Sequence, residues 1–333
     1  MRQSTCAGIS IRPPSYMAIV ERFLPTRSAS CYCVNPCCSR IGWIWLDNDL
    51  HSSSLTSSGH EVTRLVRGQP TSGEKAAHWD PMAGTIDASA LEGVDAVVHL
   101  AGENIAQRWT SAQKAKIRDS RIKGTQLLCE TLARLSSPPK VLVSASAIGY
   151  YGDRGEQILT EDSPPGRGFL AEVCRAWEAA TEPARQRGLR VVPLRFGVVL
   201  SPAGGALAKM LPPFRLGVGG MVGSGRQYMS WIALDDVVGA IQHAIVTDTL
   251  QGPTNAVAPQ AVTNQEFTKT LGKVLGRPTV FPLPAFAARL MFGEMADELL
   301  LASTRVQSAK LQGSGYRFRY PELEDALRHV LAT

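Results

Sequence analysis

Strands and helices are expected to alternate regularly in this chain of 333 residues from about residue 59 onward, and this order constrains the fold most strongly. Short runs of β-branched and apolar residues predict strands, while apolar residues at helical spacing predict helices. In chain order we expect strands at 61–67, 94–100, 141–143 and 189–195, and helices at 111–135 and 169–187. The alternation predicts an α/β, Rossmann-like fold with a doubly wound, mostly parallel sheet.

The composition favours a folded globular protein. Hydrophobic residues make up 44% of the chain and charged residues 19%, and no apolar stretch approaches the length of a membrane span. The 35 Lys and Arg residues exceed the 29 Asp and Glu residues and give a net charge of +6, but they are spread singly. Such a dispersed excess is typical of a solubility feature, so we expect neither a nucleic acid nor a membrane as partner.

The first 38 residues differ from the rest in their cysteine content. They hold five of the seven cysteines, at spacings unlike those of zinc sites, and we expect no metal. The other two, Cys129 and Cys174, lie in helix-like segments where a thiol packs as a small apolar residue, which favours a cytoplasmic protein. Residues 1–30 are basic and serine-rich, as organelle transit peptides are, so an organellar location is the alternative.

The residues after each strand are the informative ones, because ligands of doubly wound sheets bind beyond the carboxyl ends of the strands. Ala101 and Gly102 follow the second expected strand, and such small residues let a ligand approach the backbone. The third strand runs into segment 144–153, which places hydroxyls and phenols at the same edge. We therefore expect the binding site at this edge of the sheet.

Seven ordered segments carry a resemblance to a known family. They are HLAGENIAQRW (99–109), SRIKGTQLL (120–128), SASAIGYYGD (144–153), FLAEVCRAWE (169–178), LRFGVVLSPAGGAL (194–207), MLPPFRLGVGG with GSGRQYMSWIALDDV (210–237) and FGEMADELLLASTRV (292–306). Together they resemble the extended short-chain dehydrogenase/reductase superfamily, and more closely its atypical epimerase-like branch. Proteins of that branch often carry the names nucleoside-diphosphate-sugar epimerase or SulA-like cell-division inhibitor. The resemblance covers about residues 59–330.

The resemblance implies a division of the chain into three parts. We expect an atypical N-terminal segment at 1–55, an NAD(P)-binding epimerase/dehydratase-like domain at 56–280, and a small substrate-side extension at 281–333. Relatives often dimerise through two helices, so by analogy we expect a homodimer that packs helices 111–135 and 169–187.

The expected first strand and its glycine-rich turn are absent from the sequence. Proteins of this kind open with glycines that admit a pyrophosphate to a helix N-terminus, yet residues 9–58 contain only Gly42. We interpret the first 50 or so residues as the product of a frameshift or a misassigned start, which resequencing of the locus would test. A divergent but genuine N-terminus is the alternative. Under either interpretation the phosphate site, as written, is defective.

The cofactor implied by the resemblance is NADP (NADPH). NADP-selective folds carry a base near the end of the second strand, where NAD-selective folds carry an acid, and this strand ends in Arg67. We expect Arg67 to clamp the 2′-phosphate, with Arg121 as a second cation, although solvated side chains are the alternative for both. The other residues expected along the cofactor are Leu100, Ala101 and Gly102 at the ribose and pyrophosphate, with close packing as the alternative, and Val199 on the loop beside the nicotinamide.

Catalytic residues are harder to assign, because the expected Tyr-x-x-x-Lys dyad is absent. It would align with residues 169–174, which offer neither a phenol nor an ammonium group. Ser146 fits the expected hydroxyl position, and one of two tyrosines would have to replace the missing phenol. Packed aromatic residues are the alternative for both tyrosines. The candidate catalytic residues are Ser146, Tyr150, Tyr151 and Glu103, and the candidate substrate contacts are Asn104 and Trp231, the latter with a core or hinge role as the alternative.

Three functions agree with these observations. The first is an NADP-binding epimerase or oxidoreductase that acts on an unknown small molecule, such as a sugar nucleotide, and the retained hydroxyls favour it. The second is a non-catalytic NADP-binding regulator or scaffold, which the loss of the dyad favours. The third, a nucleic-acid binder, lacks a cluster of basic residues and would require steeply salt-dependent binding to DNA.

Overall fold

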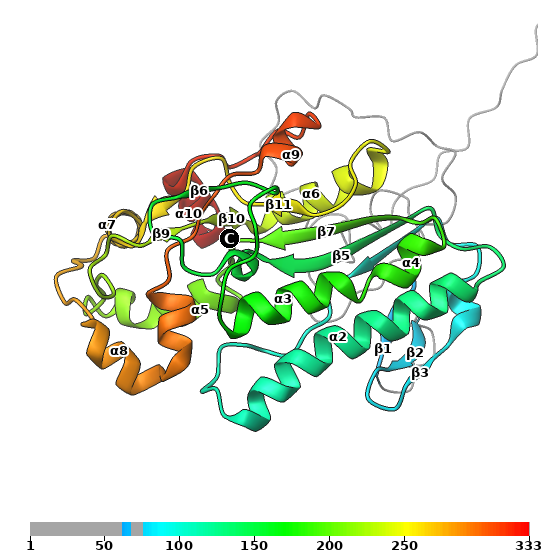
Figure 1. Cartoon of the computed structure of the whole chain (residues 1–333). Helices are drawn as coiled ribbons and strands as arrows, with labels where there is room; N and C mark the ends of the chain where they lie inside the picture. The colour runs from blue at the N-terminus through cyan, green and yellow to red at the C-terminus, as the bar shows by residue number, and fades with distance from the viewer. Residues whose placement is uncertain (1–61, 68–75, 333) are drawn as a thin grey trace, which may run out of the picture. The chain divides into compact units, whose positions relative to one another are not determined.

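Buried runs of small and β-branched residues form the central parallel sheet of the protein (Figure 1). β5 (Val141–Ala147) pairs with β4 (Ala96–His99) on one side and with β7 (Arg190–Phe196) on the other, and β7 pairs with β11 (Thr254–Ala256). The computed structural model describes residues 62–67 and 76–332. The predicted segment 1–55, with the hypothesis on its origin, lies outside the described residues.

Three shorter strands precede this sheet in the chain. β1 (Arg64–Val66) and β2 (Ala76–Asp80) are parallel, and β2 forms a hairpin with β3 (Thr85–Ile86). The 3₁₀ turn η2 (Ala88–Leu91) then leads into β4. β1 is shorter than the strand expected at 61–67, and it ends directly before Arg67.

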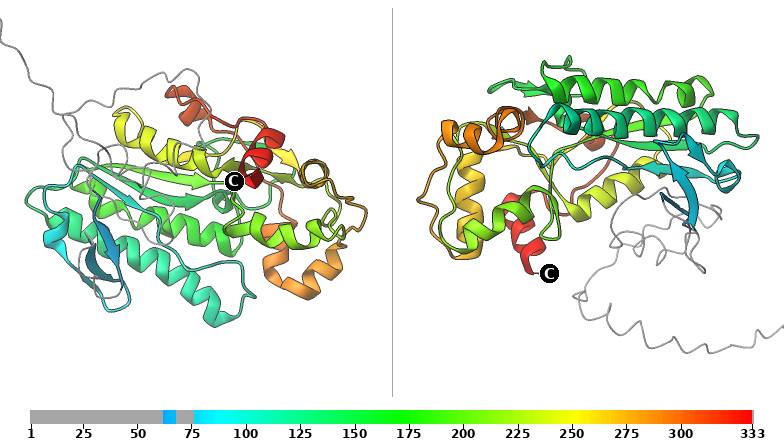
Figure 2. Two further views of the ribbon diagram at one scale, coloured as in Figure 1. Left: turned by 180° about the vertical axis from the view of Figure 1, so that it is seen from behind. Right: turned by 90° about the horizontal axis from the view of Figure 1, so that it is seen from below.

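Helices cover both faces of the sheet, as Figures 1 and 2 show. α2 (Ser111–Arg134), α3 (Phe169–Ala179) and α4 (Glu182–Gln186) lie on one face, and α6 (Leu234–Val246) lies on the other with α9 (Ala309–Gly313). The alternation of side chains along the strands produces the two layers. One apolar cluster joins Val97, Leu142 and Val191 to Leu128 and Leu132, and another joins Val98, Val143 and Val192 to Ala240 and Ile241. The predicted α/β, Rossmann-like fold with helices on both faces is thereby confirmed.

The helix expected at 169–187 is interrupted. α3 ends at Ala179 and α4 begins at Glu182, with Pro183 in its first turn. Proline lacks the N–H that a continuous helix would need and is tolerated at the start of a helix, so the sequence favours a break at this point.

The remaining elements form a smaller region at one end of the sheet. Three strand pairs lie there: β8 (Val198–Leu200) with β10 (Trp231–Ala233), β9 (Tyr228–Met229) with β12 (Val262–Thr263), and β6 (Ile158–Leu159) with β13 (Arg305–Val306). The helices are α5 (Gly205–Arg215), α7 (Asn264–Leu275), α8 (Ala285–Phe292), the π-helical turn η4 (Ala296–Leu300) and α10 (Leu323–Ala332). This region places C-terminal residues beside the carboxyl edge of the sheet (Figure 1).

Candidate functional site

The carboxyl ends of β4, β5 and β7 meet at one edge of the sheet. Their register pairs His99 with Ser144 and Ser146 with Arg195. The loop after β4 and the segment after β5, which are separate in sequence, therefore follow neighbouring strands. Ligands of parallel α/β sheets bind at such an edge, so the predicted candidate residues of these two segments occupy the expected place.

Gly102, at the end of β4, lies against the guanidinium of Arg121. A Cβ atom added to Gly102 would lie 3.0 Å from both Cζ and Nη2 of Arg121. Gly102 is exposed, while Leu100 is half-buried and Ala101 is buried in the core. Because Gly102 has no side chain, the Arg121 guanidinium fits against it, and the Gly102 backbone is exposed to solvent.

Arg121 joins the loop after β4 to helices α2 and α3. Its Nη1 donates hydrogen bonds to the carbonyl oxygens of Glu103 (3.0 Å) and Ile117 (3.1 Å), and its guanidinium lies 5.1 Å above the ring of Trp177. All of these partners belong to the β4 loop, α2 or α3. Arg67 is exposed at the end of β1, and none of the contacts between described residues brings Arg67 and Arg121 together.

Glu103 is held through its backbone and Asn104 through its side chain. The amide of Glu103 donates to Oγ of Ser120 (3.0 Å), which is buried in α2. Oδ1 of Asn104 accepts from the amide of Ala106 (2.8 Å), a local turn that uses one acceptor of this exposed side chain. These bonds hold the loop after β4, and Glu103 lies beside Arg121.

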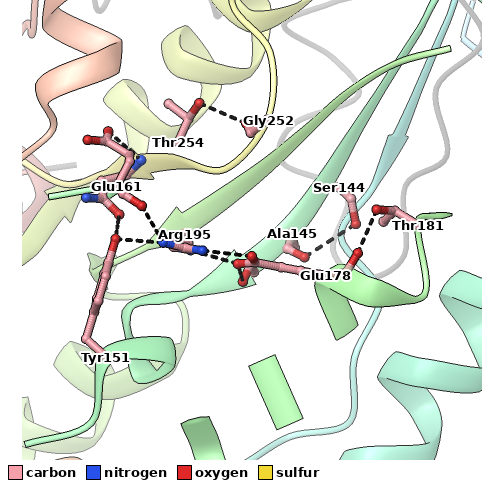
Figure 3. Close-up of polar contacts among 11 residues, drawn as sticks. Ser144, Ala145, Tyr151, Glu161, Glu178, Thr181, Arg195, Gly252 and Thr254 are labelled. Carbon is pink, nitrogen blue, oxygen red and sulfur yellow. Dashed lines mark hydrogen bonds and ion pairs between the residues drawn. The ribbon is translucent and has the colours of Figure 1, made fainter. Parts of the chain in front are cut away.

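Ser146, on β5, belongs to a buried polar network with Glu178 of α3 and Arg195 of β7. Figure 3 shows the Glu178 and Arg195 side chains. Its hydroxyl donates to Oε1 of Glu178 (2.7 Å). Glu178 in turn accepts two hydrogen bonds of 2.8 Å from Nε and Nη2 of Arg195. Ser146 is only 2% exposed, so its proton is directed at a protein carboxylate in this conformation.

Tyr151 extends the same network toward the C-terminal region (Figure 3). Its hydroxyl accepts from Nη1 of Arg195 (2.9 Å) and donates to Oδ1 of Asn255 (2.7 Å), and its side chain is fully buried. Burial raises the pKa of Tyr151 to about 12, although Arg195 and Asn255 counteract this effect. A tyrosine that exchanges protons at neutral pH needs a lowered pKa, so these observations favour the packed alternative for Tyr151.

Tyr150 is the more accessible of the two tyrosines. It is half-buried, and the guanidinium of Arg195 lies 3.5 Å from the centre of its ring. The Tyr150 and Tyr151 rings meet edge to face at 5.3 Å. Of the two predicted phenols, Tyr150 is the one with solvent access at the edge of the sheet.

Helix α3 presents no acid–base dyad at the position where the resemblance implies one. Cys174 is buried there, and a Cβ on Gly149, after β5, would lie 3.7 Å from its sulfur. Burial raises the pKa of this thiol to about 12. Cys174 is thus a packed, protonated group at neutral pH.

Val199 and Trp231 lie in paired strands. Val199, expected on a loop, belongs to β8, which is parallel to β10, and it is half-buried against the core. Trp231 is 0% exposed within an apolar cluster that includes Phe267 and Leu323, so the core alternative describes it.

Four residues of the buried network were not singled out from the sequence: Glu161, Glu178, Arg195 and Asn255. Glu161 accepts the backbone amides of Asn255 and Lys310. The sequence contains a signal for two of these residues, Glu178 and Arg195. Glu178 follows Val173, Cys174 and Trp177 on the apolar side of α3, and Arg195 ends an otherwise apolar strand. A charge within an apolar pattern indicates a buried, paired group.

The part of the chain that the structure describes has two further properties relevant to function. No helix in it is long and apolar enough to cross a membrane. The same residues include no cluster of three His, Cys, Asp or Glu side chains arranged to hold a metal ion.

The fold and the site define a Rossmann-type α/β protein of the short-chain dehydrogenase/reductase class. Residues 51–256 match the model of the NAD dependent epimerase/dehydratase family, and residues 283–330 match a domain of unknown function, DUF1731. The chain belongs to the NAD dependent epimerase/dehydratase family, as an epimerase family protein with this C-terminal domain.

Individual relatives agree with this assignment. An epimerase family protein of Mycobacterium bovis is 47% identical over 280 residues, which cover 84% of this chain and 92% of the relative. A chloroplastic homologue from Arabidopsis thaliana is 40% identical over 73% of this chain and 70% of its own length. The crystal structure of the human epimerase family protein SDR39U1 with NADPH is 34% identical, covers 88% of this chain and 99% of that chain, and has a TM-score of 0.79.

Proposed function

We propose that this protein binds NADPH and acts as an oxidoreductase or epimerase on a small organic molecule, with nucleoside-diphosphate sugars as the first class to test. The observation that carries the proposal is the open Gly102 backbone beside the Arg121 guanidinium at the carboxyl edge of the sheet. The similar human protein whose structure contains NADPH supports the choice of cofactor.

The described residues fit the adenosine and pyrophosphate side of such a dinucleotide. Gly102 is exposed, and the Arg121 guanidinium lies on the side where a Cβ atom would stand, so a phosphate that reached the Gly102 backbone would also meet this cation. Arg67 is an exposed base at the end of β1, where a 2′-phosphate is bound in NADP-selective folds. The expected glycine-rich turn lies outside the described residues and, as written, lacks its glycines.

NADPH, when bound, supplies or accepts a hydride. The residues of this chain would orient the substrate and transfer the proton that accompanies it. Tyr150 is the acid–base group that we assign, because its phenol is half-buried beside Arg195 while Tyr151 is fully enclosed. Ser146 and Glu103 stay candidate catalytic residues, and Asn104, next to Glu103 on the same loop, stays a candidate substrate contact.

A second candidate function is a non-catalytic NADPH-binding regulator. It is favoured by the enclosure of Tyr151, by the commitment of the Ser146 proton to Glu178, and by the buried thiol at Cys174 on α3. Under this proposal the site would hold the cofactor, but no phenol would exchange protons with a substrate.

The experiment that separates the two functions is a titration of the purified chain with NADPH and NADH, followed by a substrate screen. Both functions require NADPH binding that Arg67→Ala weakens. Only the enzyme shows NADPH oxidation or sugar epimerisation that Tyr150→Phe abolishes while NADPH binding stays intact. The absence of NADPH binding would refute both candidates.

We further propose that the protein works in the cytoplasm as a homodimer, without a nucleic acid or membrane partner. An organellar location is the alternative, and the chloroplastic relative supports it. Size-exclusion chromatography with light scattering measures the oligomeric state, and a fluorescent fusion in the source cell measures the location.

A further inference from the structure

Arg121 differs from most other basic residues of α2 in the groups around it. Lys114, Arg118, Lys123 and Arg134 have carboxylate oxygens at 2.8, 3.2, 3.0 and 3.9 Å, respectively. Arg121 is half-buried, and within the described part of the chain no carboxylate oxygen lies within ion-pair distance of it. Partly buried charges are normally paired, so this guanidinium is available to an anion.

The hydrogen bonds of Arg121 leave part of its guanidinium free. Nη1 donates to the carbonyl oxygens of Glu103 and Ile117. These acceptors are neutral, and the Glu103 carboxylate, although outside ion-pair distance, is near enough to favour the charged form of Arg121. Nη2 lies close to the position that a Cβ atom on Gly102 would occupy, which directs it toward the open backbone after β4. Burial lowers the pKa of Arg121, but a guanidinium stays charged at neutral pH.

The location of Arg121 determines which phosphate of a dinucleotide it would meet. Its contacts are with the β4 loop, α2 and α3, whereas Arg67 marks the end of β1. The sequence also lacks the glycines whose backbone usually binds the pyrophosphate, because residues 9–58 contain a single glycine, Gly42. A cation from α2 is a substitute for the missing backbone donors.

We propose that Arg121 binds the pyrophosphate that NADPH and NADH share, and that it does not bind the 2′-phosphate that distinguishes them. This inference rests on the proposed function, since it requires that the chain bind a dinucleotide. It differs from the expectation that Arg121 serves as a second cation beside Arg67 at the 2′-phosphate. It also explains how a chain without the glycine-rich turn retains a cofactor site.

The test is a set of titrations with NADPH, NADH and adenosine 2′-monophosphate. Arg121→Gln should weaken NADPH and NADH by the same factor, about tenfold or more, and leave adenosine 2′-monophosphate unchanged. Arg67→Ala should show the opposite pattern, with losses for NADPH and adenosine 2′-monophosphate only. Arg118→Gln, which removes an exposed cation from the same helix, is the matched control and should change none of the three.

Melting curves without ligand establish that each variant is folded at the temperature of the titration. If Arg121→Gln does not fold, Arg121→Lys takes its place, because lysine keeps the charge and loses only the planar fork; an equal loss for NADPH and NADH is again expected. Unchanged NADH affinity, or a loss confined to NADPH, would overturn the assignment of Arg121 and leave the proposed function intact. Failure of the unmodified chain to bind either dinucleotide would overturn the proposed function itself and the inference with it.

Discussion

Arg195 and Glu178 form two parallel hydrogen bonds of 2.8 Å in the interior of the protein, Nε to Oε1 and Nη2 to Oε2. Their side chains are 2% and 10% exposed. Burial alone would lower the pKa of Arg195, but the carboxylate of Glu178 raises it above its ordinary value. The pair connects β7 to α3, as Figure 3 shows. Ser146 is hydrogen-bonded to Glu178 and Tyr151 to Arg195, so the pair holds both candidate residues in place.

Removal of one partner of this pair should be strongly destabilising. Glu178→Gln leaves the Arg195 charge buried without a counter-ion, and we expect a loss of about 3–5 kcal/mol in the free energy of unfolding, measured by urea titration. The double replacement Glu178→Leu with Arg195→Met should recover much of that loss. The exposed Arg328–Glu324 pair is the control, since Arg328→Gln should have little effect. Similar small losses at both pairs would contradict the prediction.

His99 should make the stability of the protein depend on pH between about 4 and 6.5. Burial lowers the pKa of its imidazole to about 4, and Nε2 shares a hydrogen bond of 2.9 Å with Thr125. The unfolded chain binds a proton near pH 6.5 and the folded chain does not, so stability is complete above pH 6.5 and decreases as the pH falls. The loss should reach about 3 kcal/mol near pH 4.

The measurement for His99 is urea unfolding at a series of pH values for the native chain and for His99→Asn. The variant lacks the titrating group, so its stability should decrease less steeply from pH 6.5 to 4. The buried Nδ1 of His99 has no hydrogen-bond partner among the described residues. Replacement of His99 therefore removes one side-chain hydrogen bond, that of Nε2 with Thr125, and we expect the variant to fold. Parallel pH profiles for the two proteins would refute the assignment.

Glu298 of the C-terminal region should stabilise the start of α3. Its two carboxylate oxygens accept from the amides of Phe169 (2.7 Å) and Leu170 (2.8 Å), and Gly168 provides no side-chain cap. Glu298→Gln removes the charge from this helix N-terminus, and we expect a loss of about 1–2 kcal/mol. Hydrogen exchange at the two amides should accelerate.

The control for Glu298 is Glu294→Gln, which disrupts the exposed pair with Lys114 nearby. This variant should leave the exchange of the Phe169 and Leu170 amides unchanged. Equal exchange in both variants would show that the Glu298 carboxylate does not cap the helix.

Cys129 and Cys174 should resist alkylation in the folded protein. Both are buried free thiols, and burial raises the pKa of each to about 12. The thiolate fraction near pH 8 is then roughly three orders of magnitude below that of an exposed cysteine. Iodoacetamide labelling followed by peptide mass spectrometry should find both unmodified before, and modified after, unfolding in urea. Rapid labelling of Cys174 in the folded chain would indicate an open thiol beside β5.

Local patterns in the sequence were sufficient to predict the layers of the fold. Runs such as Val141–Ala147 and Arg190–Phe196 are apolar because both faces of these strands are covered, and this burial is readable residue by residue. The predicted helix at 111–135 is confirmed as α2, with Thr110 as its cap. The helix at 169–187 was extended too far, because its apolar periodicity continues across the break at Pro183.

The candidate site was predictable only in its location. Residues at the ends of neighbouring parallel strands share one edge by geometry, which is why Gly102 and Ser146 were found. Their states depend on distant partners: Glu178 is 32 residues from Ser146, and Asn255 is 104 residues from Tyr151. Whether a hydroxyl is free or engaged depends on such partners.

The sequence by itself determined the family, the order of strands and helices, and the edge of the sheet at which the candidate site lies. Only the tertiary structure decided that Tyr151 is enclosed, that Tyr150 is accessible, and that Arg121 faces Gly102 without a carboxylate partner. The physical reason is that the two kinds of property depend on residues at different separations along the chain. Hydrophobic periodicity is a local property of the chain, whereas the burial and pairing of a charge depend on segments that meet only after the sheet has formed.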